Sequence, residues 1–183
     1  TGQEFSDDLR GRDMRGLIID LRDNPGGLLA VTTDFLEPLL PANTLVVSTR
    51  GRNGIPDEVL KTTGNGDVHY TGPVVVLVNE NTASAAEIVA GALQDNHRAV
   101  ILGTRTFGKG IVQTLYDLQD GTGVKLTTQA YYLPGNSPAG RSIQDVGITP
   151  DVIMPQSEDN REILRLQRGY LRFLESEKTI GLY

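Results

Sequence analysis

The residues best suited to chemistry begin with a serine at the junction of a strand and a helix. Residues 73–78 are a short, β-branched apolar run typical of a buried strand, and residues 88–93 continue as a helix. Ser84 lies between them. The start of a helix exposes unpaired backbone N–H groups and the positive end of the peptide dipole. This position suits a nucleophile whose attack creates an oxyanion, although such a serine, taken alone, is more often a helix cap.

A lysine further along the chain has the features of a general base. Lys109 stands between Gly108 and Gly110, which leave its amine uncrowded. A lysine accepts a proton near neutral pH only if its pKa falls from about 10.4, and burial lowers it. A Ser–Lys pair needs neither histidine nor aspartate, so it suits a chain whose two histidines stand in unremarkable places. The ordinary alternative for such a lysine is a solvated surface charge.

Gln113 is the expected partner of this lysine. It follows Lys109 by four residues, and an even separation in an extended segment places both side chains on one face. A neutral amide can hold the amine by a hydrogen bond without adding a negative charge that would raise its pKa. We therefore expect Gln113 to orient Lys109.

A phosphate-binding loop is a competing interpretation of the same lysine. Gly103, Gly108 and Lys109 have nearly the spacing of a P-loop after a strand. The next residue is Gly110, however, where that motif needs a Ser or Thr hydroxyl. The segment that follows alternates like a strand, whereas a P-loop leads into a helix. The sequence thus argues against a nucleotide site.

The composition limits the remaining classes of function. A length of 183 residues predicts one domain, and the net charge of −6 argues against nucleic acid or an anionic membrane as main partner. No apolar run is long enough to span a bilayer. The absence of cysteine excludes thiolate catalysis and thiolate metal sites, so we expect no metal and no cofactor.

Strand–helix units followed by a β-hairpin predict an α/β domain. Residues 1–15 are weakly patterned, with a short helix from Ser6 interrupted by glycines, and residues 55–72 are ambiguous. The expected strands are 16–22, 44–49, 73–78, 99–102, 111–116, 124–132 and a last one near 151–154; the expected helices are 28–40, 83–95 and 160–175.

Four motifs occur in order along the chain: Asp20–Gly27, Asn79–Glu87, Thr106–Gln113 and Gly147–Asp151. Each is weak alone, but together, over about residues 16–155, they closely resemble the carboxyl-terminal processing peptidases, or tail-specific proteases. The resemblance implies a crotonase-like or Clp-protease-like α/β core of βα units, with a C-terminal β-hairpin region and a terminal helix. We expect one protease core domain over residues 1–183, with 156–183 as the C-terminal helical part.

The resemblance also assigns roles to residues. It makes Ser84 the nucleophile, Lys109 the general base and Gln113 its support. It builds the oxyanion hole from the N–H of Ala85 and that of a glycine, and both Gly26 and Gly27 are candidates. Fixed N–H donors of this kind contribute roughly 3–4 kcal/mol each to such reactions.

The implied activity is that of a serine endopeptidase that trims polypeptides with apolar C-termini near those ends. The implied compartment is extracytoplasmic, in bacteria the periplasm. Family members carry a PDZ domain, which this chain lacks, so we expect the chain to be the core of a longer protein; a homo-oligomer stays open. The alternative is a non-catalytic polypeptide- or ligand-binding domain on the same fold, and the retention of Ser84, Lys109 and Gln113 argues against it.

Overall fold

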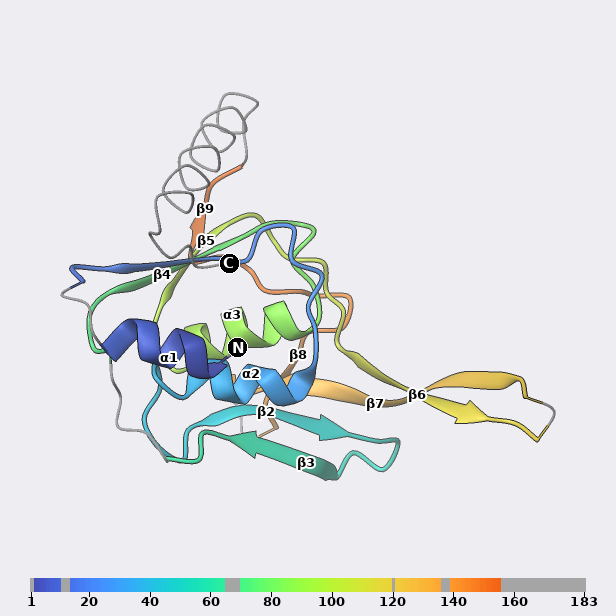
Figure 1. Cartoon of the computed structure of the whole chain (residues 1–183). Coiled ribbons are helices and arrows are strands. Elements are labelled where there is room, and N and C mark those ends of the chain that lie inside the picture. The colour runs from blue at the N-terminus through green and yellow to red at the C-terminus, as the bar shows by residue number, and fades with distance from the viewer. Residues whose placement is uncertain (1, 11–13, 65–69, 120, 136–138, 156–183) are drawn as a thin grey trace.

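The computed structural model describes residues 2–10, 14–64, 70–119, 121–135 and 139–155, drawn in colour in Figure 1. The helix expected over residues 160–175 lies outside the described residues. None of the described helices is long and apolar enough to cross a membrane.

The strands form two sheets. β1 (Leu17–Asp20), β4 (Val74–Val78), β5 (Val100–Gly103) and β9 (Val152–Ile153) run parallel in the order β1-β4-β5-β9. The second sheet is antiparallel, with the order β3-β2-β7-β6, and β8 also pairs with β7. Its strands are β2 (Leu45–Arg50), β3 (Pro56–Lys61), β6 (Ile111–Asp117), β7 (Gly123–Leu133) and β8 (Arg141–Ser142). The far end of the β6–β7 hairpin projects from the body (Figure 1).

The helices α1 (Gly2–Arg10), α2 (Leu29–Leu36) and α3 (Ala85–Asp95) fill the layer between the sheets (Figure 1). Every residue of α3 from Ala85 to Leu93 is buried, as its almost wholly apolar sequence demands. The helix contacts α2, β2, β5 and β7, so it forms the centre of the core. Gly91 allows Leu133 and Ile148 to pack directly against its backbone.

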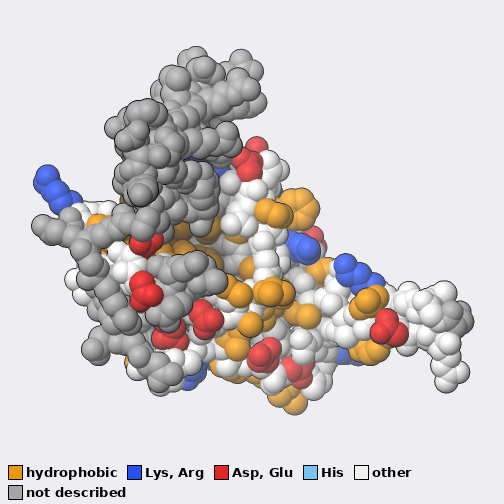
Figure 2. Space-filling model, viewed as in Figure 1, with side chains coloured by type: hydrophobic (Ala, Val, Ile, Leu, Met, Phe, Trp, Pro, Cys, Tyr) orange, Lys and Arg blue, Asp and Glu red, His pale blue; other side chains and the backbone are white. Residues whose placement is uncertain are grey.

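On the side drawn in Figure 2, acidic side chains are spread over the lower half of the molecule.

The predicted α/β class is confirmed, and three local expectations are corrected. α1 extends from Gly2 without interruption, because buried Phe5 and Leu9 anchor it and Phe5 stacks on Phe35 at 4.5 Å. α2 ends at Leu36 rather than at residue 40. The helix stops there because Pro38, two residues further on, has no N–H to donate a helical hydrogen bond.

The third correction concerns the first strand, which is expected over residues 16–22 but spans only Leu17–Asp20. β1 is buried on one face alone, and Ile18 on its other face is 67% exposed. The helices of the described chain cover one side of the parallel sheet, so alternate side chains of β1 point away from the core (Figure 1).

Candidate active site

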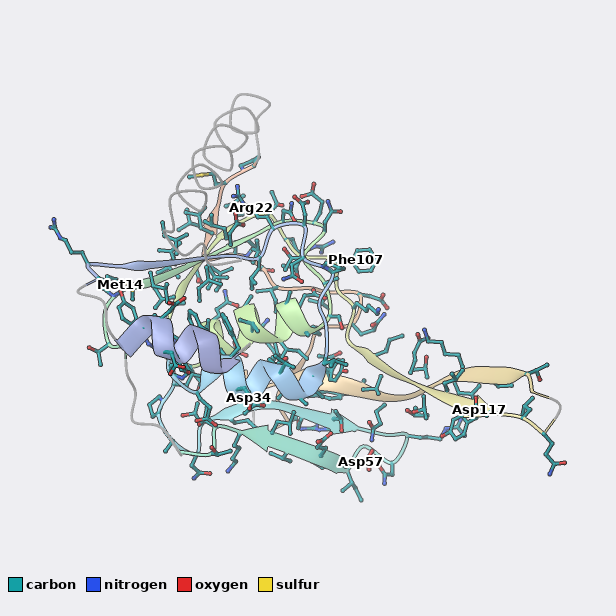
Figure 3. All side chains as sticks on the ribbon, in the orientation of Figure 1. Met14, Arg22, Asp34, Asp57, Phe107 and Asp117 are labelled. Atoms are coloured by element: carbon teal, nitrogen blue, oxygen red, sulfur yellow. The ribbon has the colours of Figure 1, made fainter. Side chains whose placement is uncertain are left out.

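The candidate site lies where loops leave the carboxyl ends of three neighbouring parallel strands. The loops follow β1, β4 and β5, a position at which open α/β sheets commonly bind ligands. Backbone bonds connect them directly: the Ala83 N–H donates to the Asn24 carbonyl at 2.9 Å, and the Phe107 N–H to the Thr82 carbonyl at 3.0 Å. The three motif-bearing segments therefore form one unit. Phe107 itself is 67% exposed, and its ring extends outward from the loop (Figure 3).

A buried amide network holds the first two loops together. Asn79 is 1% exposed; its Oδ1 accepts the Asp23 N–H at 2.9 Å and its Nδ2 donates to Asp23 Oδ1 at 2.8 Å. The Thr82 hydroxyl, also buried, donates to the Leu21 carbonyl at 2.8 Å. Because these groups satisfy one another inside the protein, the turn at residues 23–27 has a fixed position against the loop that carries Ser84.

Ser84 occupies a strained backbone position. It lies immediately before α3 with φ +58° and ψ −121°, a combination rare for a residue with a side chain. Such strain costs of order 1–3 kcal/mol and persists only where the surroundings enforce it. Ser84 is half-buried, and its carbonyl accepts the N–H groups of Glu87 and Ile88. The sequence predicted the strand–helix junction but not this conformation.

Glu87 joins the serine loop to the lysine loop through a buried carboxylate. Its Oε2 accepts the Ser84 N–H at 2.9 Å and the Lys109 N–H at 2.8 Å. Its Oε1 accepts the Gly108 N–H at 2.7 Å and the Thr106 hydroxyl at 2.5 Å. The side chain is 0% exposed. A buried carboxylate is tolerated only when donors satisfy it, and here four donors and the start of α3 do so.

No role for Glu87 was predicted from the sequence. The signal was present, because Ser84-x-x-Glu87 ahead of an apolar run has the spacing of a capping box. What the pattern could not show is that the same carboxylate also receives donors from residues 106–109.

The fourth motif supports the lysine loop. The Thr106 hydroxyl accepts the Ile148 N–H at 2.7 Å, and the Thr106 N–H donates to the Ile148 carbonyl at 3.2 Å. Gln144 Oε1 accepts the Gly110 N–H at 2.8 Å. Residues 144–148 therefore hold both ends of the segment that contains Lys109.

No hydrogen bond in the described part of the chain joins the side chains of the proposed base and its support to the serine. Lys109 and Gln113 are both exposed. Among the described residues, the Lys109 amine has no hydrogen bond or ion pair to Ser84 or Gln113. The strand argument for Gln113 is weakened by a register irregularity between Val112 and Gln113, which interrupts the simple alternation of faces. The structure thus brings the two loops together but leaves the Lys109 side chain exposed.

The backbone N–H groups of the three candidate oxyanion-hole residues differ in whether they are already paired. Gly26 lies against the serine, since a Cβ there would be 2.8 Å from the Ala85 nitrogen and 2.9 Å from Ser84 Cβ. Its own N–H, however, donates to Asn24 Oδ1 at 2.8 Å. The N–H groups of Gly27 and Ala85 have no hydrogen-bond partner within the part of the chain that the structure describes.

No group of three or more His, Asp or Glu residues in that part could hold a metal ion.

Comparison with known proteins supplies the family. The model of peptidase family S41 matches residues 2–154. The chain belongs to peptidase family S41. Its curated relatives include a carboxyl-terminal-processing protease of Synechocystis sp. (strain ATCC 27184), 45% identical over 141 residues, which are 77% of this chain and 31% of the relative. Another is the chloroplastic carboxyl-terminal-processing peptidase 3 of Arabidopsis thaliana, 41% identical over 79% of this chain and 27% of the relative.

Two solved structures share the fold of the S41 chain. The photosystem II D1 C-terminal processing protease superposes with a TM-score of 0.73 at 38% identity, over 84% of this chain and 38% of that one. Mature CPAF shares the fold at 20% identity, with a TM-score of 0.69 over 97% of this chain and 46% of its own. These matches confirm the predicted family resemblance and α/β core. The S41 chain spans about a third or less of the length of the curated relatives named here.

Proposed function

We propose that the chain is the core of a serine endopeptidase that cleaves polypeptides near their C-termini with a Ser84–Lys109 dyad. The observation that carries the proposal is the Glu87 carboxylate, which receives the backbone N–H groups of both Ser84 and Lys109 and so holds the two loops at one place. The family, and relatives named as carboxyl-terminal-processing proteases, support the same reaction.

The reaction begins with attack of the Ser84 hydroxyl oxygen on the substrate carbonyl carbon. The hydroxyl proton passes to the neutral Lys109 amine, and the carbonyl oxygen becomes an oxyanion. Collapse of this intermediate breaks the C–N bond, and Lys109 returns the proton to the leaving amine. A water molecule then hydrolyses the acyl-enzyme by the same steps, with Lys109 again accepting a proton.

We propose Gly27 and Ala85 as the oxyanion donors. The N–H of Gly26 is already used by Asn24, so Gly26 serves by its lack of a side chain, which permits close approach to Ser84. Donors that are fixed before the reaction stabilise the developing charge without reorganisation.

Catalysis requires that Lys109 lose its contact with water. The Lys109 side chain is exposed in this chain, whereas withdrawal from water favours the neutral amine that can accept the serine proton. We propose that bound substrate, or further parts of the longer protein such as a PDZ domain, cover Lys109, with Gln113 then orienting it. We also propose that the protein acts outside the cytoplasm, in bacteria in the periplasm, and the bacterial and chloroplastic relatives support this.

The test is cleavage of an unstructured peptide with an apolar C-terminus by the full-length protein. Ser84→Ala and Lys109→Ala should each abolish cleavage, while Lys125→Ala, which changes an exposed lysine in β7, should leave it intact. Covalent labelling by a fluorophosphonate should require Ser84. Undiminished cleavage by the Ser84 or Lys109 variant would refute the dyad.

The second candidate is a non-catalytic polypeptide-binding domain on this fold. The observation that favours it is the exposed Lys109 side chain, which has no hydrogen bond to Ser84 in the described part of the chain. Binding of the same peptide without cleavage, and no fluorophosphonate labelling, would support this candidate over the peptidase.

A further inference from the structure

The parallel sheet has an apolar face with no described helix on it. Because α1, α2 and α3 lie between the two sheets, the other side of β1, β4, β5 and β9 faces away from them (Figure 1). Strand register aligns two rows of side chains on that side. They are Ile18, Val75 and Val100 in one row and Asp20, Leu77, Leu102 and Val152 in the other, and together they form what we call the outer face.

The outer face is open and almost wholly apolar. Ile18 is 67% exposed, Val100 46% and Val152 45%. The residues between them, on β4 and β5, are half-buried: Val75, Leu77 and Leu102. The charged member, Asp20, is paired with Arg22, whose Nε donates to its Oδ1 at 2.7 Å. Parallel sheets are found almost always with both faces covered. A continuous apolar patch of this kind on one sheet therefore indicates a partner surface.

The chain itself continues from the edge of this face. β9, the outermost strand of the sheet beside β5, ends at Ile153, and 28 residues follow the last described position, residue 155. Four of these, residues 156–159, precede the segment 160–175. A connection of this length is typical between a strand and a helix in α/β units.

Segment 160–175 has the pattern of a helix with one apolar side. At 100° per residue its apolar side chains fall within half of the circumference, and its arginines cluster on the opposite side. The apolar set is Ile163, Leu164, Leu166, Tyr170, Leu171, Phe173 and Leu174, and the arginines are Arg161, Arg165, Arg168 and Arg172. A helix of this length spans about 24 Å, enough to cross strands of about 15 Å.

We propose that residues 160–175 form a helix that packs its apolar side on the outer face of the same molecule. The chain leaves β9 at the carboxyl end of the sheet, so the helix runs back antiparallel to the strands. The parallel sheet would then have helices on both of its faces. The short connection makes this contact intramolecular, which gives it a high effective concentration over a second copy or another protein. The proposal does not depend on proteolysis.

Cysteine cross-linking tests the proposal directly, because the chain has no native cysteine. In the full chain, Val100→Cys with Leu171→Cys should react with a short bismaleimide to give a cross-linked monomer. The matched control is Val59→Cys with Leu171→Cys, since Val59 is similarly exposed, at 49%, but lies on β3 of the other sheet. We expect the Val100 pair to cross-link at least tenfold faster. Ile18→Cys replaces Val100→Cys should that variant fail to fold.

Each other outcome overturns the proposal. Cross-linking confined to dimers, reproduced by mixing the two single-cysteine variants, would assign the outer face to a second copy. Equal rates for the two pairs, or none, would show that the segment does not dock there. In a supporting measurement on the Val100→Cys single variant, adding Leu171→Asp should raise the rate at which a maleimide labels the thiol by at least tenfold, whereas adding Arg168→Asp should leave that rate unchanged.

Discussion

Ser84 and Lys109 lie on loops that share one carboxylate, yet their side chains have different surroundings. The serine half of the site is held by contacts within the protein: Ser84 is strained and half-buried, Gly26 lies against it, and the buried Asn79 amide fixes the neighbouring loop. The lysine half is fixed at the backbone by Glu87 and Gln144, while the Lys109 side chain is exposed. The difference teaches that the serine loop is fixed by contacts within this domain, whereas the role proposed for Lys109 requires a further group to cover its side chain.

Replacing Lys109 should show the largest difference between an effect on activity and an effect on stability. We expect Lys109→Ala to lower kcat/KM of the full-length protein by about 10²–10⁴-fold, because it removes the proposed proton acceptor. The free energy of unfolding should change by no more than about 0.5 kcal/mol, since the side chain is exposed. Peptidase kinetics and urea unfolding measure the two effects. A large loss of stability would show that Lys109 has structural contacts and would break the comparison.

Glu87→Gln should damage both halves together. An amide has one acceptor oxygen, so its NH₂ group would face N–H donors that now meet a carboxylate. We expect a loss of about 1–3 kcal/mol in unfolding free energy and at least a hundredfold fall in kcat. Glu58→Gln on exposed β3 is the control for loss of one charge. Wild-type kcat in Glu87→Gln would show that the carboxylate does not position the loops.

Two adjacent glycines sharpen the description of the serine half. A Cβ at Gly26 would lie 2.6 Å from the Ala83 carbonyl oxygen, and the residue has φ +96°, so Gly26→Ala should cost about 1–3 kcal/mol of stability and slow labelling of Ser84. At Gly27 no atom lies within 4 Å of such a Cβ, and Gly27→Ala keeps the N–H, so both properties should change little. Equal effects at the two positions would contradict the assigned roles.

The smallest effect is expected at Gln113. If it orients Lys109 in the covered state, Gln113→Ala should lower kcat about tenfold, the value of one ordinary hydrogen bond, without changing stability. Gln119→Ala, an exposed glutamine beyond the end of β6, is the control. An unchanged kcat would remove Gln113 from the proposed site and leave Lys109 to be held by other groups.

Much of this protein was predictable from local patterns. The apolar runs before Ser84 and within 85–93 indicated a buried strand and a buried helix. They did so because the spacing of apolar residues and the share of β-branched residues differ between the two kinds of element. Four ordered motifs predicted the family, which comparison confirmed.

Long-range contacts were decided by the tertiary structure alone. A helical pattern can show that Glu87 faces the start of its helix, but not that Thr106, Gly108 and Lys109 donate to it from another loop. The choice between Gly26 and Gly27 depends on which N–H is taken by Asn24, and the exposure of Lys109 depends on what covers it. Sequence determines which groups a chain can offer, whereas packing of distant segments determines which of them meet and how much water surrounds them.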